Sequence, residues 1–141
     1  MRRRTMLSLL IAGLLSLLAD PHAAVAQDTT AAETAATAWL AHVDAGRYGE
    51  SLTSAAAAFK QAVTQEKWQD AVKRVRDHVG AFKTRTKSSA APMTNPPGAP
   101  AGEYVIFQYS ATFEQRATAT ETVTAVHETD GTWRIVGYFV H

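Results

Sequence analysis

Histidines are the residues of this chain best suited to chemistry at neutral pH, either as general acids and bases or as metal ligands. Four of the five lie beyond the first 26 residues, at His42, His78, His127 and His141. Two histidines four apart on a helix or two apart on a strand would favour a metal site, and none of these has such a partner. His42 and Asp44 stand two apart in a predicted helix, so they point in different directions. The sequence therefore predicts no metal site and no cofactor.

A histidine in an apolar cavity gives the one enzymatic hypothesis that the residues support. The pairing predicted for the last two strands places His127, Arg134 and Glu121 on one sheet face near Tyr138. There His127 would act as the base, and Tyr138 or Arg134 would stabilise the developing negative charge. The plainer interpretation is that His127 lies near a hairpin end, where it contacts solvent and Glu128 or Asp130. We prefer the plainer interpretation and keep the small acid–base enzyme as the alternative.

Other catalytic classes find no support, which favours a non-catalytic domain. The chain has no cysteine, so thiol catalysis, disulfides and cysteine-ligated metals are excluded. Nucleophile elbows, phosphate-binding loops and dinucleotide-binding glycine patterns are absent as well. Trp39, Trp68 and Trp133 occupy periodic apolar positions typical of a core. The candidates for contact with a small ligand are Trp39, Tyr48 and Tyr138.

The first 26 residues have the pattern of a cleavable signal peptide. Arg2, Arg3 and Arg4 precede an apolar run of roughly 13 residues, shorter than the ~20 that a membrane-spanning helix needs. Asp20 and Pro21 end the run, and 24–26 supplies a small-x-small cleavage site. We therefore expect a periplasmic or secreted protein without a membrane span after cleavage. The arginines fit a general secretory signal and also a twin-arginine signal.

The remaining residues, 27–141, are expected to form one domain. Of the 14 basic and 13 acidic residues, three arginines and one aspartate precede it, which leaves 11 basic and 12 acidic side chains. Helices are predicted at Ala31–Ala45, at Tyr48–Ala62, and from a cap at Thr64 to Gly80. The third helix has an apolar stripe at Trp68, Val72, Val75 and Val79. Strands are predicted at Phe82–Ser89, Tyr104–Phe113, Ala117–Glu128 and Thr132–Val140, with a loop at Ser88–Gly102.

Helices followed by strands predict an α+β domain, with about three helices packed on one face of a curved four-stranded antiparallel sheet. If Asp130-Gly131 forms a two-residue turn, Glu128 pairs with Trp133 and Val123 with Tyr138. One face then carries Val126, Trp133, Ile135 and Phe139, and the other Val123, Ala125, Val136, Tyr138 and Val140. Since both faces are apolar, we expect the second to pack as well, against a helix or against another copy in a homodimer through the sheet.

Several dispersed blocks resemble the bacterial domain of unknown function 4019 family of small exported proteins. They are Trp39-Leu40 with Val43–Tyr48, Phe59 with Trp68, Val75-Arg76 with Gly80, Gly98–Val105, Glu121–Thr124 and Asp130–Phe139. The resemblance covers nearly the whole mature chain and implies no activity or catalytic residues. The order of the elements is also similar to the cone-shaped nuclear-transport-factor-2-like fold, an analogy at the level of the fold alone.

Charge is uneven along the chain. The segment Lys60–Lys87 holds eight basic residues against three acidic ones. A solvated helix face with edge-strand lysines accounts for this, and so does a patch for an anionic envelope component. Nucleic acid is not an expected partner, because no aromatic residues suited to base stacking interleave this segment. The preferred function is an exported non-catalytic domain that binds a small apolar ligand or an envelope partner.

Overall fold

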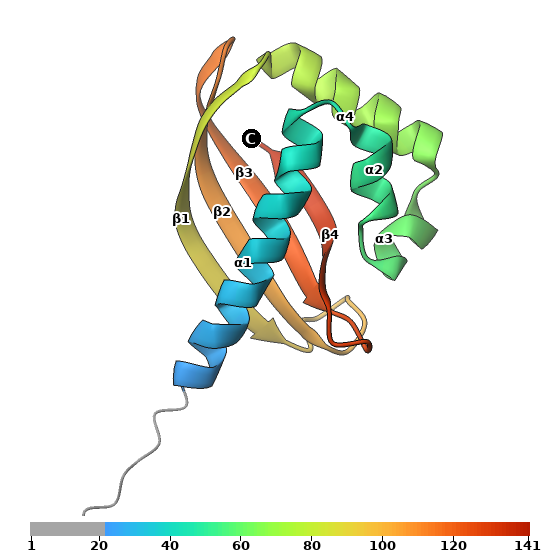
Figure 1. Ribbon diagram of the computed structural model, residues 1–141, viewed down its shortest axis with the longest axis vertical. Helices are drawn as coiled ribbons and strands as arrows, with labels where there is room; N and C mark the ends of the chain where they lie inside the picture. The colour runs from blue at the N-terminus through green and yellow to red at the C-terminus, as the bar shows by residue number, and fades with distance from the viewer. Residues whose placement is uncertain (1–21) are drawn as a thin grey trace, which may run out of the picture.

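A computed structural model describes the backbone of residues 22–141 and the side chains from residue 29 onward. Helices precede strands, which confirms the predicted α+β class (Figure 1). The elements are α1 (His22–Asp44), α2 (Tyr48–Thr53), α3 (Ala57–Ala62), α4 (Gln65–Val79), β1 (Phe82–Thr94), β2 (Glu103–Phe113), β3 (Arg116–His127) and β4 (Trp133–Val140). Most of the signal peptide predicted for Met1–Ala26 lies outside the described residues. Among the described residues, no helix is long and apolar enough to cross a membrane.

Helix α1 lies across the concave side of the sheet (Figure 1). It begins at His22, earlier than the predicted start at Ala31, and it ends at Asp44. Its predicted apolar stripe is buried as expected, and consists of Ala32, Ala36, Trp39, Leu40 and Val43. The helix ends where Gly46 adopts a φ of 74°, a left-handed conformation that glycine adopts without steric cost.

The single helix predicted for Tyr48–Ala62 is in fact two short helices, α2 and α3. Ala56 between them is extended, and its backbone N–H donates to the Ile135 carbonyl oxygen of β4 at 2.8 Å. The helix is therefore interrupted at Ala56, where the backbone forms a hydrogen bond with the edge strand β4. Trp39 and Trp68 both donate from Nε1 to Ser51 in α2, to its carbonyl oxygen at 2.7 Å and its Oγ at 2.9 Å. These bonds fix α2 between α1 and α4.

Helix α4 has the predicted bounds, because strong local signals fix both ends. Thr64 Oγ1 accepts a hydrogen bond from Lys67 N at 3.3 Å, and Gly80 ends the helix with a φ of 82°. The buried stripe differs from the predicted one at a single position. Val75 is 39% exposed, whereas the neighbouring Arg76 is only 6% exposed and takes its place in the interior.

The four strands form one antiparallel sheet in the order β1-β2-β3-β4. Strand β1 runs to Thr94, well beyond the predicted end at Ser89, because it pairs with β2 as far as Glu103. Pro92 is tolerated there since β1 is an edge strand. The expected long loop is therefore confined to the residues between β1 and β2.

The β3–β4 hairpin corrects the predicted register near its turn. Glu128 N donates to Thr132 O, so three residues form the loop, and His127 pairs with Trp133. A register shift between Thr124 and Ala125 then restores the predicted partnership of Val123 with Tyr138. The predicted pairing of Glu128 with Trp133 beside the turn is wrong, and that of Val123 with Tyr138 beyond the shift is confirmed. The difference arises because a β-bulge in β4 adds one residue to that strand only.

This bulge decides which side chains face the helices. Trp133 and Ile135 join Val123 and Ala125 in the core, although the prediction had placed them on opposite faces. The outer face is chiefly polar, with cross-strand rows such as Thr86, Ser110 and Thr120, and Ser89, Gln108, Thr122 and Phe139. The expected dimer face of Val123, Val136 and Tyr138 is therefore wrong, since Val123 is fully buried beneath the helices.

Two hydrophobic clusters fill the interior. The larger lies under α1 and α2 and includes Trp39, Trp68, Phe107, Val123 and Ile135. The smaller lies under the end of α4 and consists of Val79, Ala111, Phe113 and Ala119. In β3 the two clusters are separated by one inward position, and that position is Glu121.

Candidate functional site

Five polar side chains from five different elements meet between the two hydrophobic clusters. They are Asp44 at the end of α1, Arg76 in α4, Arg85 in β1, Glu121 in β3 and Tyr138 in β4. We refer to these five residues as the charged cluster. Two arginines face two carboxylates, so the cluster is neutral overall.

Glu121 is the central acceptor of the charged cluster and is fully buried. Its Oε1 accepts from Arg85 Nε at 2.6 Å, and its Oε2 accepts from the Tyr138 hydroxyl at 2.5 Å and from Arg76 Nη2 at 3.3 Å. One carboxylate oxygen therefore accepts from a donor in β1, and the other accepts from donors in β4 and α4. A buried charge is tolerated only with such partners.

Asp44 binds the same two arginines from the opposite side. Its Oδ1 accepts from Arg76 Nη2 at 2.9 Å and from Arg85 Nη2 at 3.0 Å, and its Oδ2 accepts from Arg85 Nη1 at 2.8 Å. The Arg85–Asp44 contact is bidentate, the strong geometry for a guanidinium–carboxylate pair. The end of α1 is thereby joined to the edge strand and to α4.

Aromatic rings complete the surroundings of both guanidinium groups. Arg76 Cζ lies 4.9 Å from the centroid of the Phe113 ring, and Arg85 Cζ lies 4.2 Å from that of Phe82. These separations are within the range of cation–π attraction. Arg76 Nε is buried and has no hydrogen-bonding partner among the described residues.

The surroundings of the charged cluster raise the pKa values of two of its members, Arg85 and Tyr138. Burial alone would lower the pKa of Arg85, but its hydrogen bonds to Asp44 and Glu121 raise the pKa above the ordinary value. Burial, and then the charge of Glu121, raise the pKa of Tyr138 well above its ordinary range. The Tyr138 hydroxyl therefore stays protonated and acts as a donor to Glu121.

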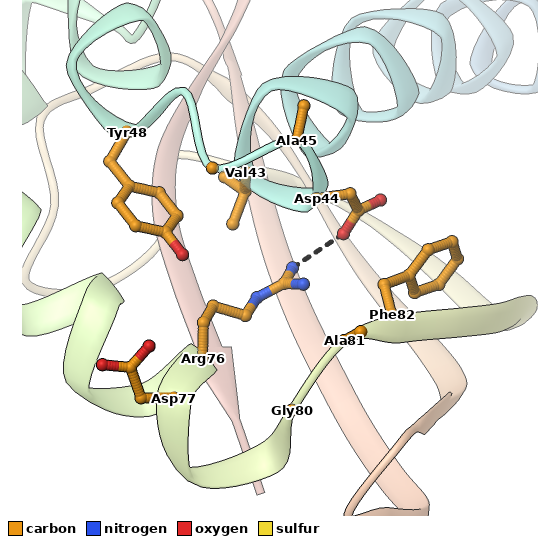
Figure 2. Close-up of a pocket in the computed structure, with 10 residues that line it drawn as sticks. Val43, Asp44, Ala45, Tyr48, Arg76, Asp77, Gly80, Ala81 and Phe82 are labelled. Carbon is orange, nitrogen blue, oxygen red and sulfur yellow. Dashed lines mark hydrogen bonds and ion pairs between the residues drawn. The ribbon is translucent and has the colours of Figure 1, made fainter.

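A cleft of about 610 Å³ opens above the charged cluster, between the ends of α1 and α4 and the start of β1. Figure 2 shows the Arg76 guanidinium group at its centre, with the rings of Tyr48 and Phe82 on either side. The apolar side chains of Val43, Ala45 and Ala81 also line the cleft, as does Asp77, whose carboxylate is paired with Lys73. The cleft thus combines apolar and polar lining residues with an ion pair, Arg76–Asp44.

The three ligand-contact candidates from the sequence lie close to this region. Tyr48 lines the cleft directly. Tyr138 belongs to the charged cluster, and its ring contacts that of Trp39 at a centroid distance of 5.4 Å. Trp39 itself is 3% exposed and lines a second, smaller cleft of about 210 Å³ with His42 and Trp133.

The residues of the acid–base hypothesis are not brought together. His127 pairs with Trp133 in the sheet, so it lies four residue positions from Tyr138, about 13 Å along the strands. Its ring stacks on Trp133 and its Nδ1 lies 3.5 Å from Glu103 Oε2. Arg134 instead binds Glu128 and Asp130 at the hairpin, at 2.6 Å and 2.9 Å.

Sequence reasoning gave no site role to four members of the charged cluster, namely Asp44, Arg76, Arg85 and Glu121, although it placed Glu121 on one sheet face near Tyr138. Two carried a recognisable signal. Glu121 occupies an inward position between Ala119 and Val123 in an alternating strand, and Arg76 follows Val72 by four residues in the apolar stripe of α4. A charged residue at a core position indicates a buried partner. No local pattern identifies Asp44 or Arg85 as that partner.

Within residues 22–141, no group of three or more potential ligands is arranged to hold a metal ion.

Comparison with known proteins gives one match. The model of the family described as "Protein of unknown function (DUF4019)" matches residues 35–138, which include the whole charged cluster. No curated protein and no solved structure matches the chain.

Proposed function

Because the chain belongs to the DUF4019 family of proteins of unknown function, membership brings no activity with it, and we propose a function from the geometry. The protein is an exported, non-catalytic domain that binds a small ligand in the cleft above the charged cluster. The observation that carries the proposal is the cleft itself, whose volume of about 610 Å³ is typical of small-molecule sites.

The lining supports a ligand with both an apolar and a polar part. Val43, Ala81 and Phe82 offer an apolar surface, while Tyr48 and the Arg76–Asp44 pair offer hydrogen-bonding groups. Since the charged cluster ties α1, α4, β1, β3 and β4 together, the base of the cleft is held rigidly. A rigid, preformed site loses little entropy when a ligand binds.

The state of the charged cluster supports binding rather than catalysis. Each carboxylate oxygen of Asp44 and Glu121 already accepts from an arginine, and the pKa of Tyr138 lies far above neutrality. A general base needs a pKa near the working pH and a free lone pair. The charged cluster offers no such lone pair on its carboxylates, so its role is to shape and polarise the cleft.

Export is the part of the proposal that rests on the sequence. The arginines, the short apolar run and the small-residue site in the first 26 residues support removal of this segment and delivery to the periplasm or beyond. Detection of the mature N-terminus at Gln27 in the periplasmic or culture fraction would test it. A chain that keeps its first residues in the cytoplasm would contradict it.

Assembly is a further part of the proposal. Phe139 on the outer face is 62% exposed, and a homodimer through this face would bury it. Sedimentation velocity over a range of concentrations should show a dimer that the variant Phe139→Ser weakens. A monomer at every concentration would remove this part and leave the ligand proposal intact.

Mass spectrometry of the protein purified from its own host tests ligand binding. Native spectra should show a bound small molecule, which denaturing spectra then release for identification. Ala81→Trp places a large side chain in the lining of the cleft and should abolish the bound species. Ala58→Trp, at an exposed position of α3 that does not line the cleft, is the matched control and should retain it. Equal retention by both variants, or no bound species in the native protein, would contradict the proposal.

A further inference from the structure

Another concave surface lies where the C-terminal half of α4 meets the start of β3 and the end of β4. It is a groove of about 460 Å³, which we call the basic groove, lined by Arg74, Val75, His78, Val79, Arg116 and Val140. None of these residues lines the cleft above the charged cluster. An inference drawn from the groove is therefore independent of the function proposed for the cleft.

Valine side chains form the apolar part of the basic groove. Val79 is buried and belongs to the smaller hydrophobic cluster, and Val140 packs against that cluster. Val75 is 39% exposed, although it sits in an amphipathic helix whose other valines are buried. The groove therefore presents an apolar strip that continues from the core to the surface.

The walls of the basic groove carry two arginines and one histidine. Among the described residues, Arg74, His78 and Arg116 make no side-chain hydrogen bond or ion pair. Asp77, which lies between Arg74 and His78 in the sequence, is already paired with Lys73. The two arginines come from opposite sides of the groove, α4 and the start of β3, so a negative group on the valines would meet positive charge from both.

We propose that the basic groove binds a single-chain anionic amphiphile, with its carboxylate held by Arg74 and Arg116 and its acyl chain along Val75, Val79 and Val140. Charge complementarity requires an anion, and the valines require an apolar body. An acidic peptide fits less well, because its backbone would lose water on the valines without gaining hydrogen bonds in return. His78 supplies an additional donor at the rim.

Calorimetric titration with dodecanoate, below its micelle concentration, tests the proposal on the protein purified after export. We expect one molecule bound per chain. Dodecyltrimethylammonium carries the same chain with the opposite charge, and acetate carries the carboxylate without the chain, so both should bind much more weakly. Equal binding of either probe would overturn the proposal, as would binding of a polyglutamate peptide without binding of dodecanoate.

Variants then locate the site. Arg74→Glu combined with Arg116→Glu should weaken dodecanoate binding roughly tenfold or more, because two attractions become repulsions. Val75→Ser should weaken dodecanoate binding without any change in charge. Arg74, Val75 and Arg116 are all exposed, so the fold should tolerate these substitutions. Lys60→Glu combined with Lys67→Glu makes the same change in net charge outside the groove and should leave affinity unchanged. Unaltered binding in both groove variants, or an equal loss in the lysine control, would rule the groove out.

Discussion

The hydroxyl group of Tyr138 donates a 2.5 Å hydrogen bond to Oε2 of Glu121, a carboxylate with no exposed surface. The two residues come from neighbouring strands, and the same carboxylate also accepts from Arg85 and Arg76. One buried acid in β3 thus joins both edge strands, β1 and β4, to α4. The stability of the domain should depend on each of these partners, because removing one leaves another buried and unpaired.

Neutralising Glu121 should be strongly destabilising. Glu121→Gln leaves Arg76 and Arg85 with a single carboxylate, Asp44, and breaking a buried ion pair in this way costs about 3–5 kcal/mol. Chemical denaturation at neutral pH measures the loss. Glu114→Gln, the same change at an exposed position, should alter the unfolding free energy by less than about 0.5 kcal/mol. A similar small effect at Glu121 would mean that its charge is not part of the fold.

Two tyrosine-to-phenylalanine changes should have different effects on stability. Tyr138→Phe removes a donor from the buried Glu121 and should cost about 1–3 kcal/mol. The Tyr109 hydroxyl is buried without a partner among the described residues, so Tyr109→Phe should be neutral or stabilise by up to about 1 kcal/mol. Denaturation midpoints of the two variants check the contrast. Equal losses would show that Tyr109 has a partner, such as an ordered water.

Alkaline pH should destabilise the domain through the same two tyrosines. Burial, and then the charge of Glu33, raise the pKa of Tyr109 to about 12, and burial raises that of Tyr138 as well. In the unfolded chain both ionise near pH 10, so the folded protein holds more protons above that pH. Their contribution to stability is complete below about pH 10 and is lost as the pH rises through the folded pKa values.

Denaturation midpoints across this alkaline range measure the effect, and phenolate absorbance follows the tyrosines directly. The decline should be shallower in Tyr109→Phe than in the native chain. A native absorbance titration in which all four tyrosines ionise together near their ordinary pKa would disprove the prediction.

Trp68 should be among the most costly core positions of the helical layer. It is 8% exposed, its Nε1 donates to Ser51 Oγ, and its ring meets Phe59 edge-on at a centroid distance of 4.9 Å. Trp68→Ala should therefore cost about 3–5 kcal/mol, as large buried aromatic residues do. Thermal or chemical unfolding tests this. A loss below about 1 kcal/mol would show that α4 does not depend on this contact.

Local signals were sufficient wherever one element could be decided without the rest of the chain. Thr64 and Gly80 mark the two ends of α4 both in the sequence prediction and in the structure. Capping and a left-handed glycine act within a few residues, so they can be recognised locally. The α+β class followed from the change of apolar period after Gly80. The α2–α3 break escaped prediction, since its cause is a hydrogen bond from Ala56 to Ile135, a residue that lies far away in sequence.

The sequence by itself determined the order of helices and strands and the family, which rest on periodicity, capping and motifs in short stretches. Only the tertiary structure decided how β4 meets β3. In a regular strand, Trp133 and Ile135 would point to the opposite face from Tyr138 and Val140, because the two pairs are offset by an odd number of positions. A bulge between them lets both pairs face the helices. It also decided that Arg76, rather than Val75, points inward, because Glu121, Asp44 and Tyr138 are there to satisfy it. Partners so distant along the chain become neighbours only when the whole domain folds.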